Sequence, residues 1–306
     1  EHHFMNCLMM PAPLQFAVKI AAHTEQLKIL TAISILPIRD MRIFAGEVVL
    51  ADIFTEGRLI LGVGRGNFRY EMERLGIPME ETRARFDESL AVLQALLERE
   101  EVSWDGDYYK FDPLTVMPRP INPGGPPMMM AAVKPDAIYH CARQGYHVQT
   151  TPLAGSKSYL QEQVDAFNRG KEEAGDVGAD LTLTLLRVGF MCHSEMEKRE
   201  RIQMAHAFLG RFDNVHEGAG IVDNGMVRAL PRRQPIDQVA KNALIGMKQE
   251  MIDKLSVFDE MGLDRIILNV NFGCDPHETL DSIQYFAEEV MPHFEDGNLG
   301  ARKIVA

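Results

Sequence analysis

Residues 27–66 have the sequence LKILTAISILPIRDMRIFAGEVVLADIFTEGRLILGVGRG, which contains a complete strand–helix–strand unit. Leu27–Leu36 is apolar and rich in β-branched residues, and residues 41–54 carry apolar side chains at helical spacing. Gly57 ends the predicted helix, and Leu59–Val63 is a second short apolar strand. A strand, a helix and a strand in this order predict two parallel strands joined by a crossover helix.

The same alternation continues towards the end of the chain. Residues 80–99 form the clearest amphipathic helix. Further strands are predicted at Met128–Val133, Tyr146–Thr150, Leu181–Met191 and Arg265–Val270, and further helices through Ala142 and over 156–173, 195–210, 248–261 and 278–291. Continuous apolar strands between amphipathic helices indicate a parallel sheet that is buried on both faces.

The strand count bears on whether this sheet closes. Six strands are predicted, near residues 29, 60, 130, 148, 186 and 268. A closed (β/α)₈ barrel has eight, so we expect the first two strands to precede Glu1, where the sequence starts without an initiator methionine or a signal-peptide pattern. The alternative is an open doubly wound sheet, but its GxGxxG marker is absent after the first strand. We predict an α/β fold of the TIM-barrel type, in one domain over residues 1–306.

Two stretches interrupt the alternation. Residues 101–127 combine several aromatic residues with the proline-rich run PRPINPGGPP. Residues 211–240 are glycine-rich and polar, with little periodicity. Long irregular connections in compact domains are usually functional or disordered. In a barrel the second stretch would follow a strand on the catalytic face, so it is predicted to be a lid, with a surface insertion as the alternative.

Composition and charge exclude several classes of protein. The net charge of −12 argues against a broad nucleic-acid interface or attraction to an anionic membrane. No run of about 20 apolar residues is present to span a membrane. The four cysteines are far apart and show no CxxC spacing, which predicts free thiols in a reducing compartment, the cytoplasm, rather than a zinc site: Cys7, Cys141, Cys192 and Cys274.

The glycine-rich sequence Gly62-Val63-Gly64-Arg65-Gly66 directly follows a predicted strand, at the end where barrels place their active sites. Glycine lets the backbone approach a ligand closely, and the guanidinium of Arg65 suits a phosphate. The alternative is an ordinary strand–helix turn with a surface arginine. Lys134 also lies at a strand end, just before a helix whose N-terminus favours anions. It is either a phosphate ligand or a solvated lysine.

The first residues, Glu1-His2-His3-Phe4, contain the side chain best suited to proton transfer near neutral pH. Adjacent residues on a strand point to opposite faces, so only one of the two histidines can face a barrel mouth directly. Adjacent histidines also lack the i, i+4 spacing of helical metal ligands. Because the strand ends offer mainly Thr, Gly, Ala and Asn, a metal-dependent hydrolase on a barrel is disfavoured and no metal site is predicted.

Taken in order, these features resemble the bacterial luciferase-like flavin-dependent monooxygenases. The resemblance covers nearly the whole chain apart from residues 211–240. The matching stretches are EHHF, TAISILP, LGVGRG, TRARFDESLAVLQAL (82–96), PMMMAAVKPDAIYHCARQG (127–145), NALIGMKQEMIDKL (242–255), EMGLDRIIL (260–268) and AEEVMPHF (287–294).

The resemblance implies a luciferase-like (β/α)₈ barrel that takes reduced FMN from a separate flavin reductase. It implies that O₂ reacts with the flavin to give a C4a-peroxyflavin, which oxidises a small organic substrate. Met5, Met9 and Met10 near the expected barrel mouth suggest an adaptable apolar pocket for it. Family members often dimerise through helices near the start of the barrel, and residues 41–54 fit such a helix, so a homodimer is expected.

The resemblance also implies roles for individual residues. His2 is similar to the proposed catalytic acid or base, and His3 is its neighbour. Arg65 and Arg83 fall where the flavin phosphate is held, as does the turn at Val133 and Lys134. Ala32-Ile33 falls where some members have a non-prolyl cis peptide beneath the isoalloxazine. Gly64 stands where bioluminescent members carry a cysteine, so no bioluminescence is expected.

One departure leaves the cofactor open. Many relatives carry hydroxyl side chains in the phosphate-binding turn, where this chain has Lys134 and Ala137. A lysine could contact the phosphate by charge, or it could indicate the deazaflavin F420 of a sister group of dehydrogenases and reductases. A non-catalytic flavin-binding relative is a further alternative, against which the intact EHH sequence argues.

Overall fold

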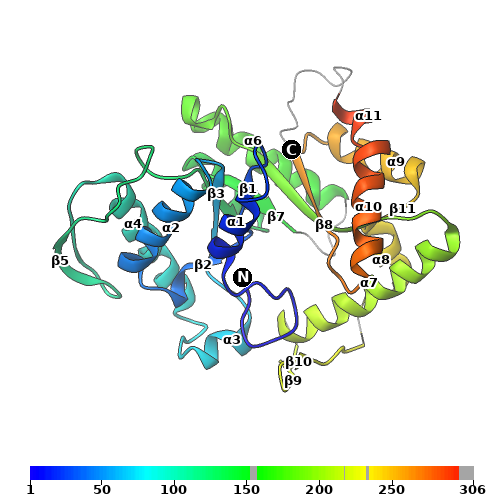
Figure 1. Ribbon diagram of the computed structural model, residues 1–306, viewed down its shortest axis with the longest axis horizontal. Coiled ribbons are helices and arrows are strands. Elements are labelled where there is room, and N and C mark those ends of the chain that lie inside the picture. The colour runs from blue at the N-terminus through cyan, green and yellow to red at the C-terminus, as the bar shows by residue number, and fades with distance from the viewer. Residues whose placement is uncertain (152–156, 217, 232–233, 296–306) are drawn as a thin grey trace. The chain divides into compact units, whose positions relative to one another are not determined.

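The computed structural model describes residues 1–151, 157–216, 218–231 and 234–295. The chain divides into two compact units (Figure 1). The first unit comprises Glu1–Ala131 and Val215–Val227, and the second comprises Ala132–Asn214 and Arg228–Ala306. The single domain expected over residues 1–306 stays a prediction.

The first unit contains three of the predicted strand regions. Its elements are α1 (Pro13–Ala21), β1 (Ile29–Leu30), β2 (Ser34–Ile35), the 3₁₀ helix η1 (Leu36–Ile38), α2 (Met41–Phe54), β3 (Leu59–Gly64), α3 (Arg69–Arg74), α4 (Thr82–Glu98), β4 (Val102–Asp105), β5 (Lys110–Leu114), β6 (Met128–Ala131), β9 (Val222–Asp223) and β10 (Met226–Val227). β3 pairs in parallel with β1, β2 and β6. This confirms the strand–helix–strand unit of residues 27–66, whose predicted helix coincides with α2.

A close backbone approach holds β3 against the chain that precedes β2. The Thr31 hydroxyl donates to the Gly62 carbonyl at 3.1 Å and accepts from the Gly62 N–H at 3.0 Å. A Cβ atom on Gly62 would lie 1.8 Å from the carbonyl oxygen of Thr31. Glycine is therefore required at this position by the packing of two backbones.

Two alanine substitutions on β3 should differ in cost. A Cβ on Gly64 would meet the side chain of Ile33, with Cδ1 at 1.9 Å and Cγ1 at 3.3 Å. This flexible side chain can shift to another rotamer, whereas the backbone carbonyl that faces Gly62 cannot. We expect Gly62→Ala to lower the free energy of unfolding by about 1–3 kcal/mol or more, and Gly64→Ala by less than about 1 kcal/mol. Thermal or urea unfolding of the protein without cofactor measures both. Equal losses would contradict this account of Gly62.

The second unit contains the other three predicted strands. Its elements are α5 (Pro135–Arg143), β7 (His147–Thr150), α6 (Lys157–Glu173), η2 (Gly175–Gly178), β8 (Leu183–Met191), α7 (Glu195–His216, whose last two residues belong to the first unit), α8 (Ile236–Asn242), β11 (Leu244–Gly246), α9 (Lys248–Glu260), β12 (Arg265–Asn269), α10 (Pro276–Glu289) and α11 (Pro292–Glu295). β8 pairs in parallel with β7, β11 and β12. One core cluster packs α5 and α6 on β7 and β8, through residues such as Ile138, Phe167 and Leu183.

The stretch 101–127, which lacks the regular alternation, contains the antiparallel hairpin β4–β5. Trp104 lies opposite Phe111 across its strands. The carboxylate of Glu88 on α4 fixes the turn, because it accepts the indole N–H of Trp104 and three backbone N–H groups, those of Asp107, Tyr108 and Tyr109.

The stretch 211–240 is more regular than its composition indicates. Residues 217 and 232–233 lie outside the described residues. α7 continues to His216, because no glycine or proline occurs between Arg211 and His216. Asn224 and Gly225, both with positive φ, form the turn of the hairpin β9–β10. An Asn-Gly pair is a strong hairpin signal, but the strands beside it are too short to show alternation.

No helix in the described ranges is long and apolar enough to cross a membrane.

Candidate active site

The ring of His2 is held on one edge and one face within the first unit. Its Nδ1 lies 3.0 Å and 3.2 Å from the two carboxylate oxygens of Glu71 on α3. The ring stacks on Phe68 with centroids 4.2 Å apart and planes inclined by 14°. Glu71 is only 1% exposed, whereas the His2 side chain is 16% exposed. The ring is therefore immobilised while part of it remains accessible.

His3 belongs to a different cluster, centred on Glu1. The Nε2 of His3 lies 2.8 Å from Glu1 Oε1, and Arg39 forms an ion pair with the same carboxylate. The other oxygen of Glu1 accepts the backbone N–H of Ile35 at 2.8 Å. Glu1 thus ties His3 to the strand β2 and to Arg39, and the Glu1 side chain is completely buried.

The Ala32–Ile33 peptide bond is cis, as predicted. It lies just before β2, and the backbone nitrogen of Glu1 donates to the Ile33 carbonyl at 2.9 Å. The side chain of Ile33 occupies the space beside Gly64, where a Cβ would collide with it. Five of the predicted site residues therefore lie along connected segments: His2, His3, Ala32, Ile33 and Gly64.

The two predicted arginines have different surroundings. Arg65 is exposed, and its guanidinium has no partner in the part of the chain that the structure describes. Arg83 lies in the first turn of α4, is 67% exposed, and forms an i, i+4 ion pair with Asp87 at 3.3 Å. Arg65 is thus available to an anion, whereas Arg83 would have to share its charge with Asp87.

The predicted turn at Val133 and Lys134 belongs to the second unit. Lys134 is the N-cap residue of α5 and is exposed. No side chain caps this helix end, and Pro135 occupies its first turn. The free N–H groups and the lysine suit an anion. The Val133 carbonyl accepts hydrogen bonds from Tyr159 and Gln163 on α6, which fixes the turn.

The segment Val215–Val227, here called the strap, belongs to the first unit, and its described residues contact the first residues of the chain and the turn after β3. His216 packs edge-on against Phe68, with centroids 5.9 Å apart, and its Nε2 lies 2.8 Å from the Asn67 amide nitrogen. Asn6 makes two hydrogen bonds to the hairpin β9–β10. Its backbone N–H donates to the Gly225 carbonyl and its Oδ1 accepts the Val227 N–H, both at 2.8 Å. Part of the predicted lid therefore contacts residues beside His2.

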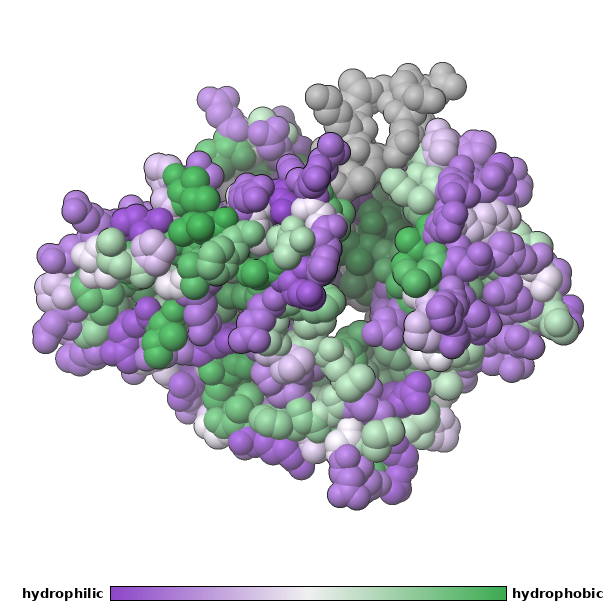
Figure 2. Space-filling model, viewed as in Figure 1, coloured by the Kyte–Doolittle hydropathy of each residue, from purple (hydrophilic) through white to green (hydrophobic). Residues whose placement is uncertain are grey.

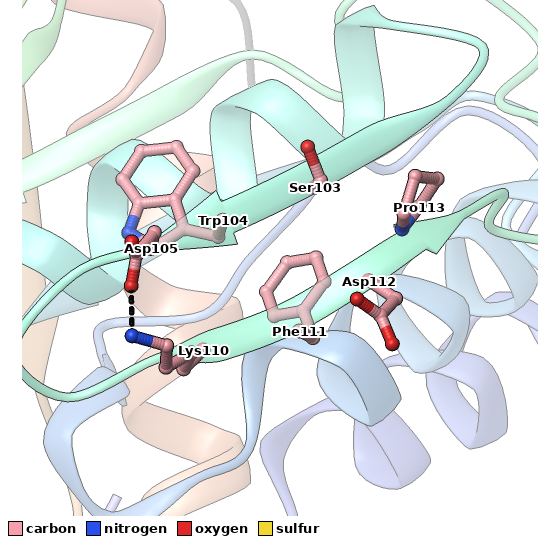
Figure 3. A pocket seen from close by; sticks show the side chains of 7 residues that line it. All are labelled: Ser103, Trp104, Asp105, Lys110, Phe111, Asp112 and Pro113. Atoms are coloured by element: carbon pink, nitrogen blue, oxygen red, sulfur yellow. Dashed lines mark ion pairs between the residues drawn. The ribbon is translucent and has the colours of Figure 1, made fainter.

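A groove on the hairpin β4–β5 offers no comparable chemistry (Figure 3). Its lining consists of Ser103, Trp104, Asp105, Lys110, Phe111, Asp112 and Pro113. Asp105 and Lys110 neutralise each other in an ion pair, drawn as a dashed line in Figure 3. No histidine faces the groove, and we assign it no catalytic role.

None of the four cysteines forms a disulfide bond, and two of them have thiols that are poor nucleophiles. Burial raises the pKa of Cys192 to about 12 and also raises the pKa of Cys274. A thiol at neutral pH is a weak nucleophile. Among the described residues, no group of three or more His, Cys, Asp or Glu side chains is arranged to hold a metal ion.

Sequence reasoning missed Glu71 and Arg39. Glu71 lies in the sequence Arg69-Tyr70-Glu71-Met72, where an acidic residue is ordinary for a helix surface. One signal was available: Glu71 follows the GVGRG turn closely, and this turn lies at the end of β3 where the sequence analysis expects the active site. Arg39 follows the strand β2 in the same way.

The family model described as luciferase-like monooxygenase matches residues 1–265 of this chain. The chain belongs to the luciferase-like monooxygenase family. The fold of this family is the TIM-barrel type that the sequence predicts.

Individual relatives include both flavin and F420 enzymes. The chain is 26% identical over 312 residues to the oxygenase component of a flavin-dependent trigonelline monooxygenase from Acinetobacter baylyi, covering 99% of this chain and 86% of that one. It is 28% identical over 293 residues to an F420-dependent glucose-6-phosphate dehydrogenase from Beutenbergia cavernae, covering 92% and 82%.

The solved structures agree on the fold. The monooxygenase RslO1 from Streptomyces bottropensis superposes with a TM-score of 0.80 at 24% identity, over 93% of this chain and 83% of that one. At this identity the likeness shows the fold alone. Together with the family match, it confirms a luciferase-like α/β architecture.

Proposed function

We propose that this protein is a flavin-dependent monooxygenase that uses reduced FMN and O₂ to oxidise a small, apolar organic substrate. The observation that carries the proposal is the held but accessible ring of His2, which contacts the buried Glu71 and stacks on Phe68. The trigonelline monooxygenase, matched over 99% of the chain, supports the reaction class. A separate flavin reductase would supply the reduced flavin.

The residues present fit a flavin phosphate and an apolar ring system. Arg65 offers an exposed guanidinium without a carboxylate partner among the described residues, which is the donor that a phosphate needs. Ala32 and Ile33 offer a partly exposed apolar surface beside Gly64. We propose that these residues of the first unit hold FMN. The phosphate contacts expected of Arg83, and of Val133 and Lys134 in the second unit, stay predictions.

When bound, reduced FMN supplies the electrons that activate O₂. The protein's own part is to orient the reactants, exclude water and move a proton. His2 is the residue proposed to move that proton, because Nδ1 is occupied by Glu71 and Nε2 has no hydrogen-bond partner in the described ranges. We propose that the strap limits access of water to this region, as a lid does.

Anaerobic titration tests the cofactor. We expect reduced FMN to bind more tightly than oxidised FMN or reduced F420, and O₂ added to the complex to oxidise a substrate drawn from a panel of apolar aldehydes, ketones and aromatics. Tight binding of F420 with indifference to FMN would assign the protein to the dehydrogenase group. Binding of neither would end the flavoenzyme proposal.

The F420 alternative is supported by a specific finding, since F420-dependent dehydrogenases match more than 90% of the chain. A phosphate contact by Arg65 would serve either cofactor. The titration distinguishes the two by which cofactor binds. The addition of O₂ distinguishes them again, because hydride transfer to F420 consumes no O₂.

We also propose a homodimer formed through α2. Phe44, Ala45, Val48 and Val49 face the core, whereas Ile43, Leu50 and Phe54 are exposed at a spacing that places them on one face of the helix. Figure 2 shows apolar side chains at the surface over the helices of the first unit. A contiguous exposed apolar face marks an interaction site.

Leu50→Glu should convert the dimer to a monomer, because it places a charge in the centre of this face. Light scattering after size-exclusion chromatography measures the mass. Met196→Glu, at a residue of α7 that is also highly exposed, is the matched control and should leave the mass unchanged. A monomeric wild-type protein would contradict the proposal.

A further inference from the structure

Two buried carboxylates contact the two adjacent histidines at different ring nitrogens. Glu71 meets Nδ1 of His2, whereas Glu1 meets Nε2 of His3. A carboxylate only accepts hydrogen bonds, so the histidine nitrogen that faces it must carry the proton. The other nitrogen of the neutral ring then carries the lone pair. The geometry therefore specifies opposite tautomers for the two neighbours.

We infer that Glu71 is a positioning residue that holds His2 as the Nδ1–H tautomer, and so makes Nε2 of His2 the proton-transfer atom of the proposed reaction. The inference rests on the proposed function for the reaction itself, but the tautomer is a property of the protein alone. His3 is excluded from the same role at Nε2, because that nitrogen donates to Glu1.

The environment of Glu71 supports this role. It is almost completely buried in the six-residue helix α3, and it accepts hydrogen bonds from Nδ1 of His2 and from the backbone N–H of His3. A carboxylate buried without donors is costly. The buried carboxylate of Glu71 therefore needs the N–H of His2 as a donor, and this hydrogen bond fixes the orientation of the His2 ring.

Phe68 restricts the remaining freedom of the ring. Stacking at 4.2 Å prevents the imidazole of His2 from tilting, and the edge contact of His216 holds Phe68 in turn. A 180° flip of the ring would put Cδ2 in the place of Nδ1, and it is disfavoured because it would break the contact with Glu71. This is the arrangement of a base whose partner carboxylate sets the tautomer.

Glu71→Gln tests the inference with almost no change in volume. In the wild-type protein, Glu71 Oε1 accepts the backbone N–H of His3, and Oε2 lies 3.0 Å from Nδ1 of His2. The His3 N–H can only donate, so it requires the amide oxygen at the Oε1 position. The amide NH₂ then replaces Oε2 and faces Nδ1 of His2, which must become an acceptor. We expect long-range ¹H–¹⁵N NMR to show His2 changing from the Nδ1–H to the Nε2–H tautomer, with its signals assigned from a His2→Gln spectrum.

Activity provides the second readout. We expect Glu71→Gln to lower kcat by roughly 10- to 100-fold, part of the contribution of a proton-transfer group, while the Kd for reduced FMN changes less than about threefold. Glu71→Asp keeps a carboxylate and should restore the wild-type tautomer and part of kcat. In the His2→Gln background, Glu71→Gln should cause no further loss.

Either of two results would overturn the inference. One is an unchanged His2 tautomer in Glu71→Gln. The other is an equal loss of kcat with and without His2, which would show that Glu71 acts elsewhere. A wild-type protein that fails to turn over with FMN would remove the proposed function, yet the NMR comparison would still decide the role of Glu71.

Discussion

His2→Gln should lower kcat by about 10²–10⁴-fold, the range contributed by a positioned proton-transfer group. Glutamine resembles histidine in size and keeps a hydrogen bond to Glu71, but it cannot exchange a proton near neutral pH. Binding of reduced FMN should change little, because His2 carries no contact to the predicted phosphate ligands. Single-turnover oxidation of substrate, measured after rapid mixing with O₂, reports the chemical step.

Two further variants make this result specific. His23→Gln alters an exposed histidine of the same unit and should keep full activity. His3→Gln should lose less activity than His2→Gln, since its Nε2 is already engaged by Glu1 at 2.8 Å. A larger loss in His3→Gln would transfer the proton-transfer role to His3, and wild-type activity in His2→Gln would remove the histidines from the mechanism.

The strands of the sheet were predictable because their apolar runs are continuous. All six predicted strand regions are present and parallel, and α2 begins and ends at the predicted residues. The hairpin β4–β5 was not predicted, because its stability depends on Glu88, a residue of the preceding helix that accepts N–H groups from the turn. Long-range contacts of this kind leave no periodic signal.

The site was predictable to the extent that it depends on backbone features. The cis peptide Ala32–Ile33 is present as expected. Position 62 requires glycine because a Cβ atom there would collide with the Thr31 carbonyl oxygen. The sequence alone could not show that the two histidines contact different carboxylates. His2 and Glu71 are 69 positions apart, and only the folded chain shows which acidic residue meets which ring nitrogen.

Arg65→Ala should raise the Kd for reduced FMN by roughly 10- to 150-fold, the effect of losing one charged hydrogen bond of about 1.5–3 kcal/mol. Arg65 follows a buried strand and is exposed, and its side chain makes no hydrogen bond or ion pair in the described part of the chain. Its removal should therefore leave stability nearly unchanged. Riboflavin, which lacks the phosphate, should bind Arg65→Ala and the wild-type protein equally well. That comparison assigns the lost affinity to the phosphate rather than to the ring system.

The matched control is Arg69→Ala, four residues away on α3. Arg69 is also exposed, but its guanidinium is paired with Glu73 at 3.3 Å, so its removal should leave the Kd for FMN unchanged. Lys134→Ala tests the second predicted cation in the same titration. If Arg65→Ala and Arg69→Ala weaken FMN equally, the effect is one of net charge. If Arg65→Ala has no effect while Lys134→Ala does, the phosphate is held by the turn before α5, and the GVGRG turn serves only the close packing of β3.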